Sequence, residues 1–230
     1  MILNMKVVIS GYGRMGHMVE EVLKSRGIGI AGASEDIASF DKEIAKDCVC
    51  VDFTVPEAFK ANYKALADNF KAVVVGTTGW NDIKDEVIGY FQEKGTPMIY
   101  SSNYSVGVNV LLAAVGLISE SLGKAGGYAP YIVEKHHIHK LDAPSGTAKS
   151  LAAVVRDGMG VSPDTASVRV GELAGIHTVG FEGAVDRITV THEAFSRKGF
   201  AEGAVIAALM TEGLSGVHEF KELFFKDLQK

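Results

Sequence analysis

The chain has 230 residues, of which 47% are hydrophobic and 22% are charged, and its formal net charge is −5 at pH 7. This composition is typical of a soluble globular protein, and the length allows one large domain or two small ones. The acidic balance argues against a general nucleic-acid-binding protein and against attraction to an anionic membrane surface. The sequence shows neither an uninterrupted apolar run of about 18 residues nor a signal-peptide pattern. We therefore expect no nucleic-acid or membrane partner.

Two cysteines, Cys48 and Cys50, lie two residues apart within an apolar run. A disulfide between residues so close in one strand would be strained. We therefore expect buried thiols and a reducing, cytoplasmic compartment, with a redox-active pair as the alternative.

The first elements predict a nucleotide-binding turn. An apolar strand at 5–10 leads into G-x-G-x-x-G, and a helix is expected over about 14–25. In such turns the first glycine permits the tight bend, the second lets a pyrophosphate approach the backbone, and the third lets helix pack on strand. The alternative is an ordinary tight β–α turn. The loop consists of Gly11, Tyr12, Gly13, Arg14, Met15 and Gly16.

Charged residues near this loop leave the choice of nucleotide open. A second strand is expected at 28–33, and Glu35 and Asp36 follow it. A carboxylate at this place takes the ribose hydroxyls of a dinucleotide. Arg14 could instead meet a 2′-phosphate, which Glu35 or Asp36 would repel.

The following segments alternate between strand and helix. Strands are expected at 48–54, 71–75 and 97–101, and helices at about 56–68 and 81–94. Such alternation indicates a parallel, doubly wound sheet. A Gly-Thr-Thr-Gly loop follows the strand at 71–75, at the carboxyl end where open parallel sheets bind ligands. Its members Gly76, Thr77 and Thr78 suit contact with a cofactor, and a simple turn is the alternative.

The regular alternation of strand and helix ends after residue 105. Helices are expected at 106–122, 147–157 and 200–214, and strands at 131–135, 167–170, 177–181 and 187–192. Strands gathered after a helix pair indicate an α+β domain with a largely antiparallel sheet. We expect the helix at 200–214 to pack on the first domain.

One stretch, residues 134–148, concentrates the titratable groups. It holds three histidines, two lysines and two carboxylates before Pro144, and then a helix begins. The N-terminus of that helix favours a bound anion such as a carboxylate. A proton donor, a cation and an anion-binding helix N-terminus together suggest a site for a small acidic molecule. The alternatives are a zinc site formed by His136, His137 and His139 and a solvated polar loop.

Together these motifs resemble the 4-hydroxy-tetrahydrodipicolinate reductase family, also called dihydrodipicolinate reductase, over essentially the whole chain. They are Gly-Arg-Met-Gly at 13–16, Val-Asp-Phe-Thr at 51–54, Gly-Thr-Thr-Gly at 76–79, Ser-Asn-Tyr-Ser-Val-Gly-Val-Asn at 102–109, the stretch at 134–148 and Ser-Arg-Lys-Gly-Phe-Ala-Glu-Gly-Ala at 196–204. The resemblance implies an NAD(P)H-dependent oxidoreductase of lysine and diaminopimelate biosynthesis. Its substrate would be a small dicarboxylate, 4-hydroxy-tetrahydrodipicolinate, reduced to tetrahydrodipicolinate with loss of water.

The resemblance also implies an α/β architecture in two domains. An N-terminal Rossmann-type parallel-sheet domain would comprise residues 1–105 and 198–230. An α+β substrate-binding and oligomerisation domain would comprise residues 106–197. Members of the family are typically homotetramers.

Carried over by position, the resemblance implies residue roles. His136 would be the principal proton donor, and Lys140 a second donor whose charge holds the substrate. The dicarboxylate would also be bound by His137, Gly146 and Thr147. NADH or NADPH would be held by the glycine loop, by Glu35 or Asp36, and by Gly76, Thr77, Thr78, Ser101, Ser102, Asn103 and Tyr104. No metal is implied.

Three other functions make different predictions. A metal-dependent hydrolase using the three histidines would lose its activity to a chelator. A nucleotide-binding regulator would bind NAD(P)H and turn nothing over. A different dehydrogenase on the same fold would bind the nucleotide and reduce another small acid.

Overall fold

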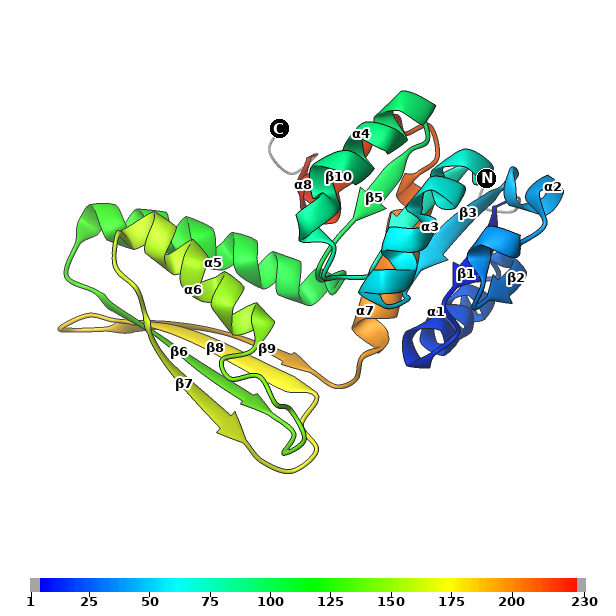
Figure 1. The fold of residues 1–230 in the computed structure, drawn as a ribbon. Coiled ribbons are helices and arrows are strands. Elements are labelled where there is room, and N and C mark those ends of the chain that lie inside the picture. The colour runs from blue at the N-terminus through cyan, green and yellow to red at the C-terminus, as the bar shows by residue number, and fades with distance from the viewer. Residues whose placement is uncertain (1–4, 227–230) are drawn as a thin grey trace. The chain divides into compact units, whose positions relative to one another are not determined.

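The computed structural model describes residues 5–226, and the chain divides into two compact units (Figure 1). The first unit contains the residues up to Ser105 together with those from Phe200 onward, and the second runs from Val106 to Gly199. Each unit has its own sheet and its own apolar core.

The first unit contains a six-stranded parallel sheet in the order β10-β5-β4-β3-β1-β2. Its strands are β1 (Lys6–Ser10), β2 (Gly29–Ser34), β3 (Cys48–Asp52), β4 (Ala72–Val75), β5 (Met98–Tyr100) and β10 (Val217–Glu219). Every residue of β3 and β4 is buried, as expected for apolar strands covered on both faces. The predicted parallel, doubly wound sheet is confirmed, and Cys48 and Cys50 are free, buried thiols within it.

Helices and short 3₁₀ turns connect these strands. The helices are α1 (Arg14–Ser25), α2 (Lys42–Ala45), α3 (Pro56–Asn69), α4 (Lys84–Lys94), α7 (Lys198–Met210) and α8 (Phe220–Phe225), and the 3₁₀ turns are Ile37–Ser39 and Asn81–Ile83. α7 packs on the first unit as predicted. A Cβ on Gly203 would lie only 1.7 Å from the carbonyl oxygen of Tyr104, so the two backbones are in direct contact. The helix expected over 200–214 ends earlier, at Met210, and the short elements β10 and α8 that follow it were not predicted.

The second unit has a four-stranded sheet in the order β7-β6-β8-β9. Its strands are β6 (Ala129–His136), β7 (Asp164–Arg169), β8 (Gly175–Glu182) and β9 (Arg187–Ala194). β8 pairs antiparallel with both β6 and β9, whereas β7 runs parallel to β6. The expected largely antiparallel sheet is confirmed, with this one parallel pair added.

Two helices, α5 (Val106–Ala125) and α6 (Gly146–Met159), pack together on one face of this sheet (Figure 1). Leu111 and Val115 of α5 share a core with Leu151 of α6 and Phe181 of β8. The helices approach most closely at two glycines. A Cβ on Gly123 would lie 2.4 Å from the carbonyl oxygen of Gly158, and a Cβ on Gly158 would lie 2.6 Å from the Cβ of Ser119.

α5 is also the one helix among residues 5–226 that meets a membrane-span criterion of length and hydropathy. An 18-residue window of this 20-residue helix has a mean hydropathy of 1.7, so the expectation that the chain lacks so long an apolar segment needs correction. Asn109, Ser119 and the end of the helix at Lys124 interrupt the apolar sequence. Because its inner face packs on α6 and the sheet, α5 is accounted for as a core helix of this unit.

Candidate active site

The glycine-rich turn between β1 and α1 has the geometry that its sequence predicts. Gly11 has φ +83°, and a Cβ there would lie 2.5 Å from the carbonyl oxygen of Phe53. A Cβ on Gly16 would lie 2.3 Å from the carbonyl oxygen of Gly11. A Cβ on Gly13, by contrast, would meet no atom within 4 Å. Gly11 and Gly16 therefore close the turn, and Gly13 presents open backbone to an approaching group.

The N-terminus of α1 is available to an anion. Gly13 is the N-cap and supplies no side-chain hydrogen bond, so the first N–H groups of the helix are not satisfied by a capping side chain. A phosphate is the usual partner of such a helix end after a glycine turn. Arg14 is exposed and Met15 half-buried in this first turn. These observations fit a bound dinucleotide.

Two neighbouring carboxylates that follow β2 accept hydrogen bonds from different parts of the chain. Glu35 accepts a hydrogen bond of 2.7 Å from the backbone N–H of Tyr12, within the glycine turn. Asp36 instead accepts a hydrogen bond of 2.7 Å from the hydroxyl of Ser39. Of the two carboxylates that the sequence offers for the ribose, Glu35 is thus the one joined to the turn.

Behind the turn, the buried carboxylate of Asp52 organises the next loop. Ser10 donates to Asp52 at 2.6 Å and the hydroxyl of Thr77 donates at 2.5 Å. The Thr77 hydroxyl also accepts from the backbone N–H of Thr54 at 2.7 Å, so it is used within the protein. Burial raises the pKa of Asp52 above its ordinary value, and the hydroxyl donors lower it. Gly76 is required here, because a Cβ would lie 2.1 Å from the Phe53 ring.

The predicted loops at 76–78 and 101–104 meet around a hollow of about 200 Å³. It is lined by Thr77, Thr78, Gly79, Trp80, Asn81, Lys84, Tyr100, Ser101, Ser102 and Glu219. The Ser101 hydroxyl donates to the backbone carbonyl of Asn103 and accepts from its N–H, which fixes the loop. Tyr104 is only 1% exposed, and its hydroxyl donates to the carbonyls of Val75 and Ile99. Its side chain is therefore part of the core and does not face the hollow.

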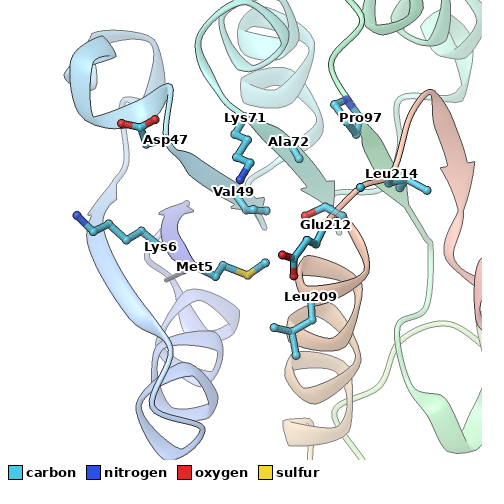
Figure 2. Close-up of a pocket in the computed structure, with 12 residues that line it drawn as sticks. Met5, Lys6, Asp47, Val49, Lys71, Ala72, Pro97, Leu209, Glu212 and Leu214 are labelled. Carbon is cyan, nitrogen blue, oxygen red and sulfur yellow. The ribbon is translucent and has the colours of Figure 1, made fainter. Parts of the chain in front are cut away.

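A second hollow, of about 300 Å³, lies at the opposite edge of the same sheet (Figure 2). Met5, Asp47, Lys71 and Pro97, which line it, each stand just before or at the start of a strand, so this is the amino edge. Figure 2 shows the side chains of Met5 and Glu212 turned toward each other across the opening. Nucleotides bind at the carboxyl edge of such sheets. This hollow therefore lies at the edge of the sheet opposite the hollow lined by Thr77 and Ser101.

In the second unit, His136 ends β6 and is bonded to the carboxylate of Glu134. The two residues lie on the same face of the strand, and Oε2 of Glu134 contacts Nδ1 of His136. Glu134 has no solvent exposure and His136 has 7%. Burial lowers the pKa of His136, an effect that the Glu134 charge opposes and that Lys140 and Arg169 reinforce.

Strand register brings two further residues to this pair. His136 stands opposite Arg169 of β7, and Glu134 stands opposite His177 of β8. Arg169 Nη2 donates to Oε1 of Glu134 at 2.8 Å. Burial would raise the pKa of Glu134, but hydrogen bonds from Arg169, Ser167 and His136 bring it to about 2. Glu134 is therefore an ionised carboxylate despite its burial.

His177 joins the cluster to the N-terminus of α6. Its ring lies 5.1 Å from that of His136, nearly perpendicular to it. Its Nε2 is 3.0 Å from the hydroxyl of Ser145, which also caps α6 by accepting from the N–H of Ala148 at 3.2 Å. Burial lowers the pKa of His177 to about 4, so the ring is neutral at pH 7.

The remaining predicted substrate residues lie along the loop and the helix start. Lys140 is half-buried and donates to Asp142 at 2.7 Å. His137 is held by its backbone N–H, which donates to the carbonyl of Leu173 at 2.9 Å. Gly146 is exposed, and a Cβ there would meet no atom within 4 Å, while Thr147 is half-buried. The stretch thus places a cation and the N-terminus of α6 close together in the chain.

The three histidines considered as zinc ligands are not brought together. The His137 and His139 rings lie 6.0 Å apart, and His139 is exposed beside Glu172. The group with metal-binding spacing among residues 5–226 is instead Glu134, His136 and His177, whose ligand atoms all lie within 4.8 Å. Arg169 already forms an ion pair with Glu134 of that group, and its positive charge would repel a bound cation.

Three residues of the site have no role predicted from the sequence. They are Asp52, Arg169 and His177. The Val-Asp-Phe-Thr motif did contain a signal for Asp52, an acid inside an apolar strand. Arg169 and His177 lie in strands more than 30 residues along the chain from Glu134, and only the pairing of the strands brings them close.

Comparisons with known proteins agree with one another. A family model described as the N-terminus of dihydrodipicolinate reductase matches residues 5–104, and one described as its C-terminus matches residues 107–224. The 4-hydroxy-tetrahydrodipicolinate reductase of Christiangramia forsetii is 34% identical over 232 residues, covering 95% of this chain and 97% of its own. That of Methanopyrus kandleri is 36% identical over 229 residues, covering 91% and 83%. The fold is similar to that of the dipicolinate-bound dihydrodipicolinate reductase from Paenisporosarcina sp. TG-14, with a TM-score of 0.80, 18% sequence identity and coverage of 95% and 98%.

Proposed function

Because this chain belongs to the dihydrodipicolinate reductase family, we propose that its first unit holds the nicotinamide nucleotide and its second unit holds the substrate and the proton donor. The chain is an NAD(P)H-dependent 4-hydroxy-tetrahydrodipicolinate reductase of lysine and diaminopimelate biosynthesis. The nucleotide, when bound, supplies the hydride. The protein's residues supply binding, orientation and the proton.

His136 is the proton donor in this proposal. The observation that carries it is the buried contact with Glu134, which holds a titratable ring rigidly beside Lys140. Because burial lowers the pKa of His136, its protonated form is a stronger acid than a free imidazolium. A bound dianionic substrate would favour protonation and so charge the ring before transfer.

The dicarboxylate is held by Lys140 and by the N-terminus of α6. Lys140 supplies a positive charge on the loop, and the helix start at Gly146 and Thr147 supplies backbone N–H groups. His137 lies next to the proton donor and completes the set. Fixing both carboxylates orients the ring carbon that is to be reduced.

The arrangement of carboxylates supports NADH as the preferred nucleotide. Glu35 is bonded to the glycine turn through Tyr12, where the ribose of a dinucleotide lies in this fold. An ionised carboxylate accepts from the ribose 2′-hydroxyl and repels a 2′-phosphate. The exposed Arg14 is the residue that would favour NADPH instead.

The family resemblance further supports a cytoplasmic homotetramer without nucleic-acid or membrane partners. The helices of the second unit cover one face of its sheet, and β7 is exposed at every position but Arg169. An exposed sheet of this kind suits association with other copies. The buried free thiols of Cys48 and Cys50 suit a reducing compartment.

A coupled assay tests the proposal. The substrate is generated in place from aspartate semialdehyde and pyruvate by the preceding synthase, and oxidation of NADH and of NADPH is followed separately. Rapid oxidation by the wild type is expected, with NADH preferred, and His136→Gln should lower turnover about 100-fold or more. Turnover of His136→Gln near that of the wild type would exclude His136 as the proton donor.

A further inference from the structure

We propose that Glu134 is a positioning residue for His136. It fixes the imidazole so that Nε2 is the atom that releases the proton, and Arg169 in turn ties Glu134 to the loop that carries Lys140. The inference rests on the proposed function of His136 as proton donor. Of the two residues concerned, Glu134 is fully buried and Arg169 is half-buried.

The contact between Glu134 and His136 determines which ring nitrogen titrates. Oε2 of Glu134 contacts Nδ1 of His136. Because an ionised carboxylate is only an acceptor, Nδ1 keeps its proton whether the ring is charged or neutral. The proton that is gained and lost is therefore on Nε2.

The surroundings of Nε2 agree with that assignment. Gly175, at the start of β8, has no side chain, and a Cβ there would lie 2.9 Å from Nε2. Any larger residue at this position would cover the atom. The His177 ring packs against the side of His136 and, being neutral, adds no charge.

Arg169 connects the carboxylate to the neighbouring loop. Its Nη2 donates to Oε1 of Glu134 at 2.8 Å and to the carbonyl oxygen of Asp142 at 2.6 Å. Its Nε donates to the carbonyl oxygen of Lys140 at 3.3 Å. The planar guanidinium of Arg169 thus fixes the position of the Lys140 loop relative to the carboxylate that orients His136.

The charges around His136 predict the direction in which its pKa should move when each neighbour is neutralised. The groups that face the ring are Glu134, whose negative charge favours the imidazolium, Lys140 and Arg169, whose positive charges disfavour it, and the neutral His177. Neutralising Glu134 should therefore make His136 lose its proton at lower pH. Neutralising Arg169 should do the opposite.

The test compares Glu134→Gln and Arg169→Gln with the wild type, with Glu182→Gln as the control. Glu182 forms an exposed ion pair with Arg187 on the same sheet. For Glu134→Gln we expect kcat to fall about 100-fold, the scale of one general acid, and KM for the dicarboxylate to change less than about threefold. The alkaline limb of kcat/KM should move to lower pH in Glu134→Gln and to higher pH in Arg169→Gln. Glu182→Gln should match the wild type.

If Glu134 and Arg169 were only structural, their substitution would lower the yield of folded enzyme without moving the alkaline limbs of the two variants in opposite directions. Limbs that move in the same direction, or that do not move, would overturn the proposal. ¹⁵N NMR of the wild type gives a readout without catalysis, since the neutral His136 should carry its proton on Nδ1. A neutral ring protonated on Nε2 would also overturn it, even if Glu134→Gln does not fold. Failure of His136→Gln to lose turnover would instead remove the proton-donor role, leaving the tautomer result standing.

Discussion

The carboxylate of Glu35 accepts a hydrogen bond of 2.7 Å from the backbone N–H of Tyr12. This bond joins the segment after β2 to the glycine turn after β1, so the carboxylate is held beside the turn. A carboxylate has further acceptor sites, and Glu35 can therefore keep this bond while it accepts from a ribose hydroxyl. Asp36, one residue later, is turned to Ser39.

Glu35→Gln should relax the choice between the two nucleotides. Removing the negative charge removes the repulsion of a 2′-phosphate, and we expect the ratio of kcat/KM for NADPH to that for NADH to rise about 10-fold, equivalent to about 1.4 kcal/mol. Asp36→Asn is the matched control and should leave the ratio unchanged. If Asp36→Asn moves the ratio and Glu35→Gln does not, the assignment of the two acids is reversed.

Two glycines of the turn should separate nucleotide binding from folding. Gly13→Ala adds a methyl group in open space, so the melting temperature should stay near that of the wild type while nucleotide affinity falls. Gly16→Ala places its Cβ 2.3 Å from the carbonyl oxygen of Gly11 and should cost about 1 to 3 kcal/mol of stability. Thermal unfolding and nucleotide titration of both variants measure the difference. Equal loss of stability in the two would contradict this division.

Lys140→Gln should weaken substrate binding more than it slows turnover. A hydrogen bond to a charged group contributes about 1.5 to 3 kcal/mol, so KM for the dicarboxylate should rise roughly 10- to 100-fold. Lys124, exposed near the end of α5, provides the control, since Lys124→Gln removes the same charge elsewhere in the unit. Steady-state kinetics at fixed nucleotide decide the matter, and an unchanged KM in Lys140→Gln would exclude a direct contact.

The stability of the folded chain should depend on pH through His177. Its pKa is lowered to about 4 by burial, whereas an unfolded histidine has its ordinary value of 6.5. Between those values the unfolded chain binds a proton that the folded chain does not, so the free energy of unfolding falls as pH is lowered from 6.5 toward 4. The full effect is about 3 kcal/mol.

Denaturant unfolding of the wild type and of His177→Gln at pH 7, 6 and 5 measures this dependence. The variant should show a flatter decline, with a residual slope from His136 and His192, whose pKa values burial also lowers. Parallel declines in the two proteins would show that His177 titrates normally in the folded state.

Much of the first unit follows from local sequence. The strands β1, β3 and β4 are short apolar runs, and the spacing of the glycines predicts the turn that follows β1. β10 has three residues and α8 has six, which is too short for periodicity to reveal them. They become ordered by pairing with β5 and by burial of Phe220, both of which are long-range effects.

The charged cluster of the second unit shows what local sequence does not contain. The sequence places Glu134 and His136 two residues apart on a strand, and so on one face of it. Whether an arginine or a histidine stands opposite them depends on the register of β7 and β8, which a shift of one residue would change. The predicted roles of His136 and Lys140 came from the family resemblance, whereas Arg169 and His177 are brought to the Glu134–His136 pair by the neighbouring strands.

The close crossing of α5 and α6 at Gly123 and Gly158 has a consequence at the far end of the second helix. α6 has 14 residues and is thus about 21 Å long. At one end its backbone rests directly on α5, and at the other Ser145 is bonded to His177. A larger side chain at Gly123 or Gly158 would push the two helices apart at this crossing and tilt α6. Its other end would then move, so the size of these two residues helps to set the position of the helix N-terminus that we propose binds the substrate.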